Sequence, residues 1–138
     1  MDMRQLAIFV PGVPRTKGSL ELRNRSTGAL AGDRFEKQWA AMVTRKALDA
    51  WAGGAPLEGP IAVRLLFAMP TESVIVNGPG AGDLDKLERS ILDAITKAKV
   101  WRDDVQVTSL SSRKVAAGAG VGRMQSGVTI QIQQDQGQ

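Results

Sequence analysis

The chain has 138 residues, and its apolar fraction of 43% and charged fraction of 23% are ordinary for one soluble globular domain. It contains no His, no Cys and no Tyr, which excludes imidazole acid–base catalysis, thiol nucleophiles, tyrosine intermediates and zinc sites built from Cys or His. Its formal net charge of +4 favours polyanionic partners such as nucleic acid.

The first third of the chain predicts a strand, a basic connection and a helix. Leu6–Val10 is short, apolar and followed by Pro11-Gly12, which is typical of a mostly buried strand. A helix is expected from Asp33, because Asp33 and Glu36 have the spacing of a capping box, and Gly53-Gly54 ends it. Its apolar stripe is predicted to comprise Phe35, Trp39, Met42, Val43, Ala47, Ala50 and Trp51.

The remainder predicts four more elements, separated by Pro- and Gly-rich turns. These are a strand at 61–67, a helix at 84–97, a strand at 105–114 and an alternating strand at 128–132. The second helix should bury Leu87, Ile91, Leu92 and Ile95. The order β-α-β-α-β-β predicts a small α+β domain over residues 1–132, with two helices packed on one mixed sheet, and residues 133–138 are expected to form a disordered tail.

Three tryptophans, Trp39, Trp51 and Trp101, are expected to belong to the core rather than to an interface. No run of 18 apolar residues and no signal-peptide pattern is found. Together with the lack of cysteine, this pattern leads us to expect a cytoplasmic protein.

The most informative residues are acidic and lie in two short pieces. Asp83 and Asp85 fall where a loop changes into a helix, and Asp103-Asp104 separates Trp101 from a β-favouring run. The first pair has a structural explanation, because aspartate is favoured at helix N-caps and in first turns. The second pair is poor strand material unless charge is required there.

Carboxylates grouped in a basic chain indicate a hard divalent cation. Mg²⁺ prefers oxygen ligands and is usually held by one or two carboxylates together with substrate phosphates. If the helix and the following strand return Asp104 to Asp83 and Asp85, the three side chains can share an ion. The first hypothesis is therefore metal-dependent chemistry on a phosphodiester.

The sequence also resembles the RusA family of Holliday junction resolvases, which are common in phages and prophages. The resemblance covers most of the chain and begins with Phe9-Val10-Pro11-Gly12-Val13-Pro14 and Lys17. It is strongest in Gly82-Asp83-Leu84-Asp85-Lys86-Leu87, in Leu92-Asp93-Ala94-Ile95, and in Val100-Trp101-Arg102-Asp103-Asp104-Val105-Gln106-Val107 with Lys114 downstream. It implies a RusA-like fold and a homodimer that nicks two opposed strands of a four-way DNA junction with Mg²⁺, for which Mn²⁺ can substitute.

Carried over by position, the resemblance implies that Asp83, Asp85 and Asp104 are catalytic and bind the metal, with Asp103 as an auxiliary acid. It also implies a bacterial host cell and products with 5′-phosphate ends. The sequence departs from the family pattern at Lys86, where Asn is usual, and at Arg89, where a catalytic Lys is usual. Arg89 cannot act as a general base, so we expect it to stabilise negative charge on the phosphate, the alternative being an ion pair with Asp85.

DNA binding is expected to involve phosphate contacts from cationic side chains, namely Arg15, Lys17, Lys86, Arg102 and Lys114. Three alternatives stay open on the sequence. One is a non-catalytic phage DNA-binding protein whose acids are helix caps, a second is a less selective flap or fork nuclease, and a third is a structural protein that binds Ca²⁺.

Overall fold

The computed structural model describes residues 4–16, 33–70, 83–118 and 125–135. Its elements in chain order are β1 (Gln5–Pro11), α1 (Asp33–Trp51), β2 (Ile61–Met69), α3 (Leu84–Lys97), the 3₁₀ turn η1 (Asp104–Gln106), β3 (Val107–Ala116) and β4 (Gly127–Gln134). This order confirms the predicted α+β domain.

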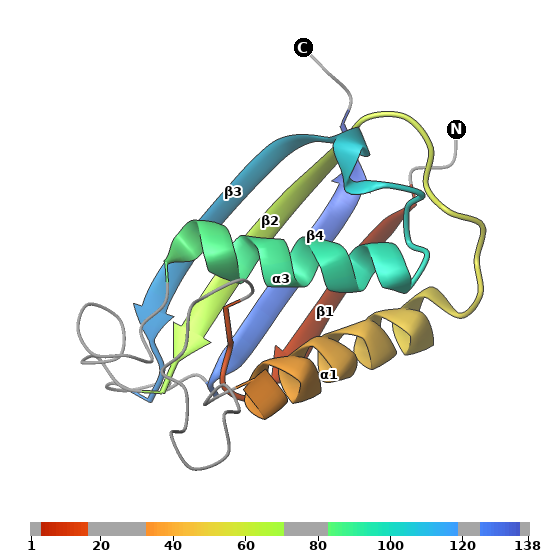
Figure 1. The fold of residues 1–138 in the computed structure, drawn as a ribbon. Coiled ribbons are helices and arrows are strands. Elements are labelled where there is room, and N and C mark those ends of the chain that lie inside the picture. The colour runs from red at the N-terminus through yellow and green to blue at the C-terminus, as the bar shows by residue number, and fades with distance from the viewer. Residues whose placement is uncertain (1–3, 17–32, 71–82, 119–124, 136–138) are drawn as a thin grey trace.

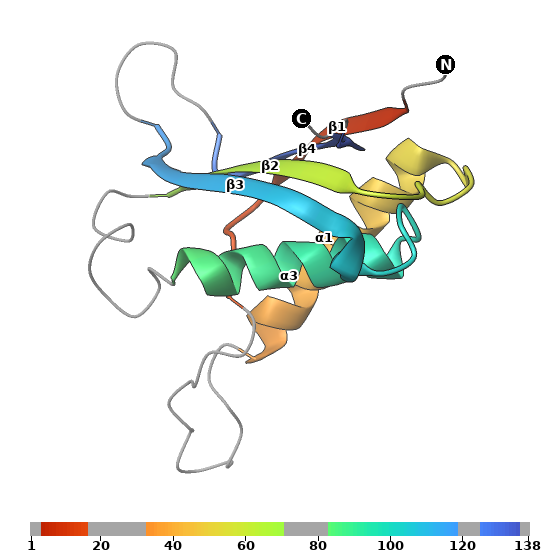
Figure 2. The same ribbon diagram turned by 90° about the horizontal axis from the view of Figure 1, so that it is seen from above.

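The strands form one mixed sheet with the order β1-β4-β2-β3 (Figure 1). β4 pairs antiparallel with both β1 and β2, whereas β2 and β3 pair in parallel and are connected through α3. Figure 2 shows that α1 and α3 cover the same face of the sheet and that, among the described elements, no helix covers the other face. In the described part of the chain, no helix is long and apolar enough to cross a membrane.

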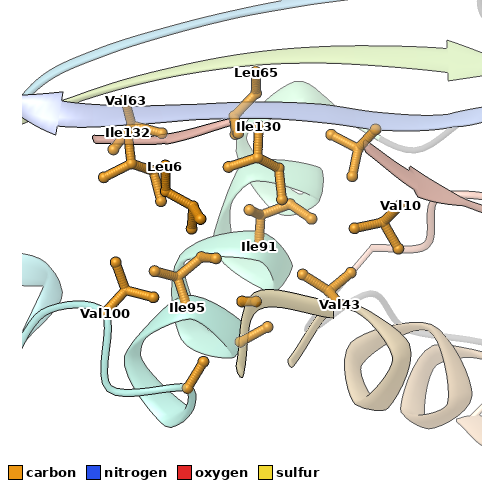
Figure 3. Close-up of a cluster of buried hydrophobic side chains, with 14 of the residues drawn as sticks. Leu6, Val10, Val43, Val63, Leu65, Ile91, Ile95, Val100, Ile130 and Ile132 are labelled. Carbon is orange, nitrogen blue, oxygen red and sulfur yellow. The ribbon is translucent and has the colours of Figure 1, made fainter. Parts of the chain in front are cut away.

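The core lies between the two helices and the sheet (Figure 3). Leu87, Ile91 and Ile95 recur at four-residue steps along α3 and are buried, as predicted, while Leu92 is partly buried beside them. They pack with inward side chains of the strands, which include Val10, Val63, Leu65, Ile130 and Ile132. This contact fixes α3 on the sheet.

The buried stripe of α1 is narrower than predicted. Trp39, Val43 and Ala47 are buried at four-residue steps, but Phe35 and Met42 are 44% and 43% exposed. The predicted stripe took in neighbouring positions around the helix, but α1 packs against α3 and the edge strand β1 only on the side of Trp39, Val43 and Ala47, so Phe35 and Met42 stay exposed. Ala50 is also exposed, and Trp51 is half-buried with its ring against Arg4.

Element ends differ from the sequence prediction at β3 and β4. The strand expected from residue 105 begins at Val107, because η1 occupies residues 104–106 and turns the chain. β4 continues two residues beyond the predicted end at Ile132, since Gln133 pairs with Gln5 and Gln134 pairs with Ile61.

Trp101 anchors the segment that follows α3. Its side chain is fully buried, and its indole Nε1–H donates a hydrogen bond of 2.7 Å to Oγ1 of Thr96. Thr96 in turn donates to the carbonyl of Leu92 at 2.9 Å. The segment that carries Asp103 and Asp104 is therefore attached to the carboxyl end of α3. The core position predicted for Trp39 and Trp101 is confirmed.

Truncation of Leu87 tests the importance of the α3 contact. Leu87 is 1% exposed, so Leu87→Ala should lower the free energy of unfolding by about 2–5 kcal/mol through reduced burial and a residual cavity. Leu48→Ala on α1 is the matched control, because Leu48 is 47% exposed and the same truncation should cost less than about 1 kcal/mol. Urea unfolding followed by circular dichroism measures both, and equal losses would contradict the described packing.

Candidate active site

Asp83 stands at the N-cap of α3 without serving as a side-chain cap. Its backbone has φ −84° and ψ 147°, and its carbonyl accepts from the amides of Lys86 and Leu87, but its carboxylate makes no capping hydrogen bond. The carboxylate is 74% exposed and, among the residues that the structure describes, its ion-pair partner is Nζ of Lys86, at 4.0 Å. An exposed i,i+3 pair of this length is worth less than about 1 kcal/mol. The acid is thus available to a ligand.

Asp85 lies in the first turn of α3 and is also exposed. Arg89 follows four residues later and is exposed on the same helix. Between these two described residues there is no ion pair within 4 Å, so the alternative salt bridge from Asp85 to Arg89 is not present. Glu88, which lies between them in sequence, instead accepts a short hydrogen bond from the hydroxyl of Ser112 on β3.

The second acidic piece is built around Gln106. Asp103 caps η1, because its Oδ1 accepts from the amide of Val105 at 3.1 Å. Gln106 completes a capping box, since its Oε1 accepts from the amides of Arg102 at 2.9 Å and Asp103 at 3.2 Å.

The amide nitrogen of Gln106 fixes the same turn to a distant segment. Its Nε2 donates to the carbonyls of Leu57 at 3.0 Å and Gly59 at 3.1 Å. Gln106 therefore uses both donors and two acceptor positions of its side chain. The sequence prediction missed this residue, although the Asp-x-x-Gln spacing of Asp103 and Gln106 was the available signal.

Asp104 is exposed at the start of η1, with its carboxyl close to other acids. Although the residue as a whole is exposed, desolvation of its carboxyl group raises the pKa of Asp104 above its ordinary value. A side-chain hydrogen bond to Asp103 and the negative charges of Asp103 and Asp93 raise this pKa further. Asp93, on α3, is a neighbour that the sequence prediction did not assign to the site.

The two acidic pieces lie near opposite ends of α3. Ser112 of β3 contacts Glu88 in the second turn of α3, and β3 runs from η1 toward the amino end of that helix (Figure 1). Asp104 is electrostatically coupled to Asp93, which lies eight residues, or about 12 Å of helix, beyond Asp85. Within the described ranges, no group of three or more His, Cys, Asp or Glu side chains is placed to hold a metal ion.

The cationic residues predicted to bind DNA are dispersed. Arg15 is half-buried, with its guanidinium 5.3 Å from the ring centroid of Phe35. Arg102 is exposed next to the acidic turn, and Lys114 is half-buried on β3, on the face that carries α3. Lys86 is the partner of Asp83, and Lys17 lies outside the described residues.

Comparison with known protein families gives one match. The family model described as endodeoxyribonuclease RusA matches residues 11–133. The chain belongs to the RusA family. No curated protein matches it. The matched range covers the chain from the last residue of β1, Pro11, through all but the last residue of β4, and it contains both acidic pieces.

Membership of the RusA family gives the chain the activity of an endodeoxyribonuclease that acts on Holliday junctions. It also makes branched DNA the substrate class. A nuclease of this family with no His and no Cys has carboxylates as its available metal ligands. Asp83, Asp85 and Asp104 are exposed carboxylates of that kind.

Removal of Gln106 should release the acidic turn. Gln106→Leu leaves the carbonyls of Leu57 and Gly59 and two backbone amides without a partner, so the free energy of unfolding should fall by about 1–3 kcal/mol. In hydrogen-exchange measurements, the amides of Arg102 and Asp103 should exchange faster than in the wild type. Gln38→Leu, at an exposed position of α1, is the control, and equal protection at residues 102–103 in both variants would contradict this role of Gln106.

Because the pKa of Asp104 is raised in the folded protein, replacing its carboxyl group by a neutral one should increase the free energy of unfolding, by an amount that depends on pH. A carboxyl group whose pKa is higher in the folded than in the unfolded protein destabilises the fold when it is ionised. For Asp104 this destabilisation is absent well below its ordinary pKa of 3.8 and is complete above its pKa in the folded protein. In EDTA, Asp104→Asn should therefore be more stable than the wild type at pH 7, by about a few tenths of a kcal/mol for such an exposed group. The difference should vanish near pH 3. A variant that is less stable than the wild type at pH 7 would contradict the prediction.

Proposed function

We propose that the chain is a Mg²⁺-dependent, structure-selective endodeoxyribonuclease that resolves four-way DNA junctions by paired symmetric nicks. The products carry 5′-phosphate ends, and the enzyme works in the cytoplasm of a bacterial host. The observation that supports the proposal best is the state of Asp83, whose carboxylate is exposed at a helix N-terminus and is not used for capping. A purely structural N-cap would use that side chain in a hydrogen bond.

The metal is assigned to Asp83, Asp85 and Asp104. Their carboxylate oxygens are the ligand type that Mg²⁺ prefers, and Mn²⁺ accepts the same set. The surroundings of Asp104 support the assignment: desolvation and then the neighbouring Asp103 and Asp93 raise its pKa, and a nearby cation would relieve the repulsion from these two acids. When bound, the ion supplies charge neutralisation and polarisation at the scissile phosphate.

A homodimer fits both the substrate and the placement of the acids. A four-way junction needs two symmetric cuts, and a two-fold dimer carries two equivalent sites. Asp83 and Asp85 do not form one complete set with Asp104 within a single described protomer. A two-fold axis can bring the amino end of α3 in one protomer to η1 of its partner, which would join the two halves.

The remaining residues position and bind DNA. Arg89 is exposed one turn beyond Asp85 and stabilises negative charge on the phosphate, a role that a permanently charged guanidinium can perform. Asp103 acts as the auxiliary acid by holding η1, which carries Asp104. Arg15, Lys17, Lys86, Arg102 and Lys114 are assigned to phosphate contacts.

Asp83→Asn tests the site directly. The substitution removes a metal-binding charge at an exposed position, so cleavage of a four-way junction in Mg²⁺ should fall by at least about 100-fold. Junction affinity in EDTA should stay within about threefold, because phosphate contacts provide most of the binding energy. Asp49→Asn on α1 is the matched control and should cut normally.

A cleavage assay with different DNA substrates, with and without metal, distinguishes junction resolution from the alternative functions. Four-way, flap and linear duplex DNA are compared, each with Mg²⁺ and with EDTA. Selective nicking of the four-way junction in Mg²⁺ supports resolution, equal cutting of flaps supports a less selective nuclease, and binding without cutting under every condition supports a non-catalytic DNA-binding protein. Normal cutting by Asp83→Asn would show that the site is assigned to the wrong residues.

A further inference from the structure

The face of the sheet opposite the helices is open in the described protomer (Figure 2). Alternation along the strands and the pairing register arrange its outward residues in four rows across the sheet. Besides the apolar row Pro11-Gly127-Ala68-Val115, these rows are Gln5-Gln133-Ala62-Ser109, Ala7-Gln131-Arg64-Ser111 and Phe9-Thr129-Leu66-Arg113. A shallow depression of about 140 Å³ lies over the first two of these last three rows. We call the twelve side chains of the last three rows the open sheet face.

The open sheet face is cationic. It carries Arg64 and Arg113, both exposed, and contains no Asp or Glu. Neither arginine has an ion-pair partner within 4 Å among the described residues. The acids of α3 and η1 lie instead on the helix side of the molecule. The two faces therefore differ in charge.

The two arginines are placed as diagonal neighbours. Arg64 is in register with Ser111 on β3, and Arg113 lies two residues further along that strand. Neighbouring strands lie about 4.8 Å apart and two residues along a parallel strand span about 6.6 Å, so the two Cα atoms are about 8 Å apart and both side chains can reach one sugar–phosphate strand. Hydroxyl and amide groups around Arg64, those of Ser109, Ser111, Gln131 and Gln133, add donors for phosphate oxygens.

The third row adds an apolar platform. Phe9 is 37% exposed, and Leu66 is partly exposed between Phe9 and Arg113, across β4 from Phe9. An exposed aromatic ring on a sheet beside cationic side chains is suited to stacking on an unpaired base, and such stacking strengthens binding to unpaired strands whatever their sequence. The face thus combines groups for phosphates with a surface for a base.

We propose that the open sheet face is a second DNA-contact surface, which holds one strand near the branch point through Arg64 and Arg113 and stacks an unpaired base on Phe9. This inference rests on the proposed function for its substrate, but it uses none of the residues assigned to catalysis. A second copy of the chain is a poorer occupant. An isologous contact confined to this face would supply no acid to pair with the arginines, because its twelve side chains include no Asp or Glu.

The salt dependence of binding tests the two arginines. Junction affinity is measured in EDTA by fluorescence anisotropy between about 50 and 200 mM salt. The double variant Arg64→Gln/Arg113→Gln should reduce the log–log slope by about 1.4–1.8, because each phosphate that is no longer neutralised lowers the slope by about 0.7–0.9. The control Arg45→Gln/Lys46→Gln removes two exposed charges from α1 and should leave the slope unchanged.

Phe9→Leu tests the stacking platform. It should weaken binding to a junction or a single strand by about fivefold or more and leave linear duplex affinity unchanged. Circular dichroism melting establishes that each variant is folded, and gel filtration reports its oligomeric state. Unchanged slopes and affinities in folded variants would overturn the proposal, and a change of oligomeric state in the arginine variant would assign the face to a second copy instead. Loss of cutting by Asp83→Asn does not depend on either result, so the active site and the open sheet face are judged separately.

Discussion

The packing of α3 on the sheet is the constraint on which the site depends. Leu87, Ile91 and Ile95 are buried against the strands, and Trp101 attaches the chain after the helix to Thr96. A helix of 14 residues spans about 21 Å and does not bend readily without a proline or a bulge. Its two ends therefore hold the acidic pieces at a set separation. The distance between Asp83 and Asp104 is a property of the core rather than of flexible side chains.

The acidic residues differ in what the fold requires of them. Asp103 has a structural role, because its carboxylate caps η1 and its backbone is held by Gln106. Asp83 occupies the equivalent position on α3, yet its side chain makes no such bond. Desolvation raises the pKa of Asp104, and the neighbouring negative charges of Asp103 and Asp93 raise it further. An N-cap aspartate whose side chain makes no capping hydrogen bond is a feature that a fold would ordinarily avoid, and so is a carboxyl group held next to other negative charges. Both features are typical of functional sites.

The sequence predicted the helices and strands but not η1, and it did not predict where the two acidic pieces lie relative to each other. The periodicity of α3 predicted its bounds and its buried residues, because a helix on a sheet repeats its contacts every turn. Phe35 and Met42 were predicted to be buried because they are hydrophobic, but they are exposed. Hydrophobicity alone does not show which side of α1 is left uncovered by the rest of the fold. The expected meeting of Asp104 with Asp83 and Asp85 depended on tertiary geometry, and within the described residues of one protomer it is not found. The coupling of Asp93 to Asp104 and the bonds from Gln106 to Leu57 and Gly59 span distant parts of the chain, which no short motif contains.

The central position of β4 has a consequence for how the molecule is made. In the sheet that the described residues form, β1 pairs with β4 alone, and β4 lies between β1 and β2 although it follows the other three strands in chain order. Residues 5–11 must therefore wait for residues 127–134 to leave the ribosome before they can find a pairing partner, at synthesis rates of about 5–20 residues per second. Such long-range closure slows folding. The nascent chain can assemble the β2–α3–β3 unit early, but it gains a complete nuclease domain only at the end of translation of this region.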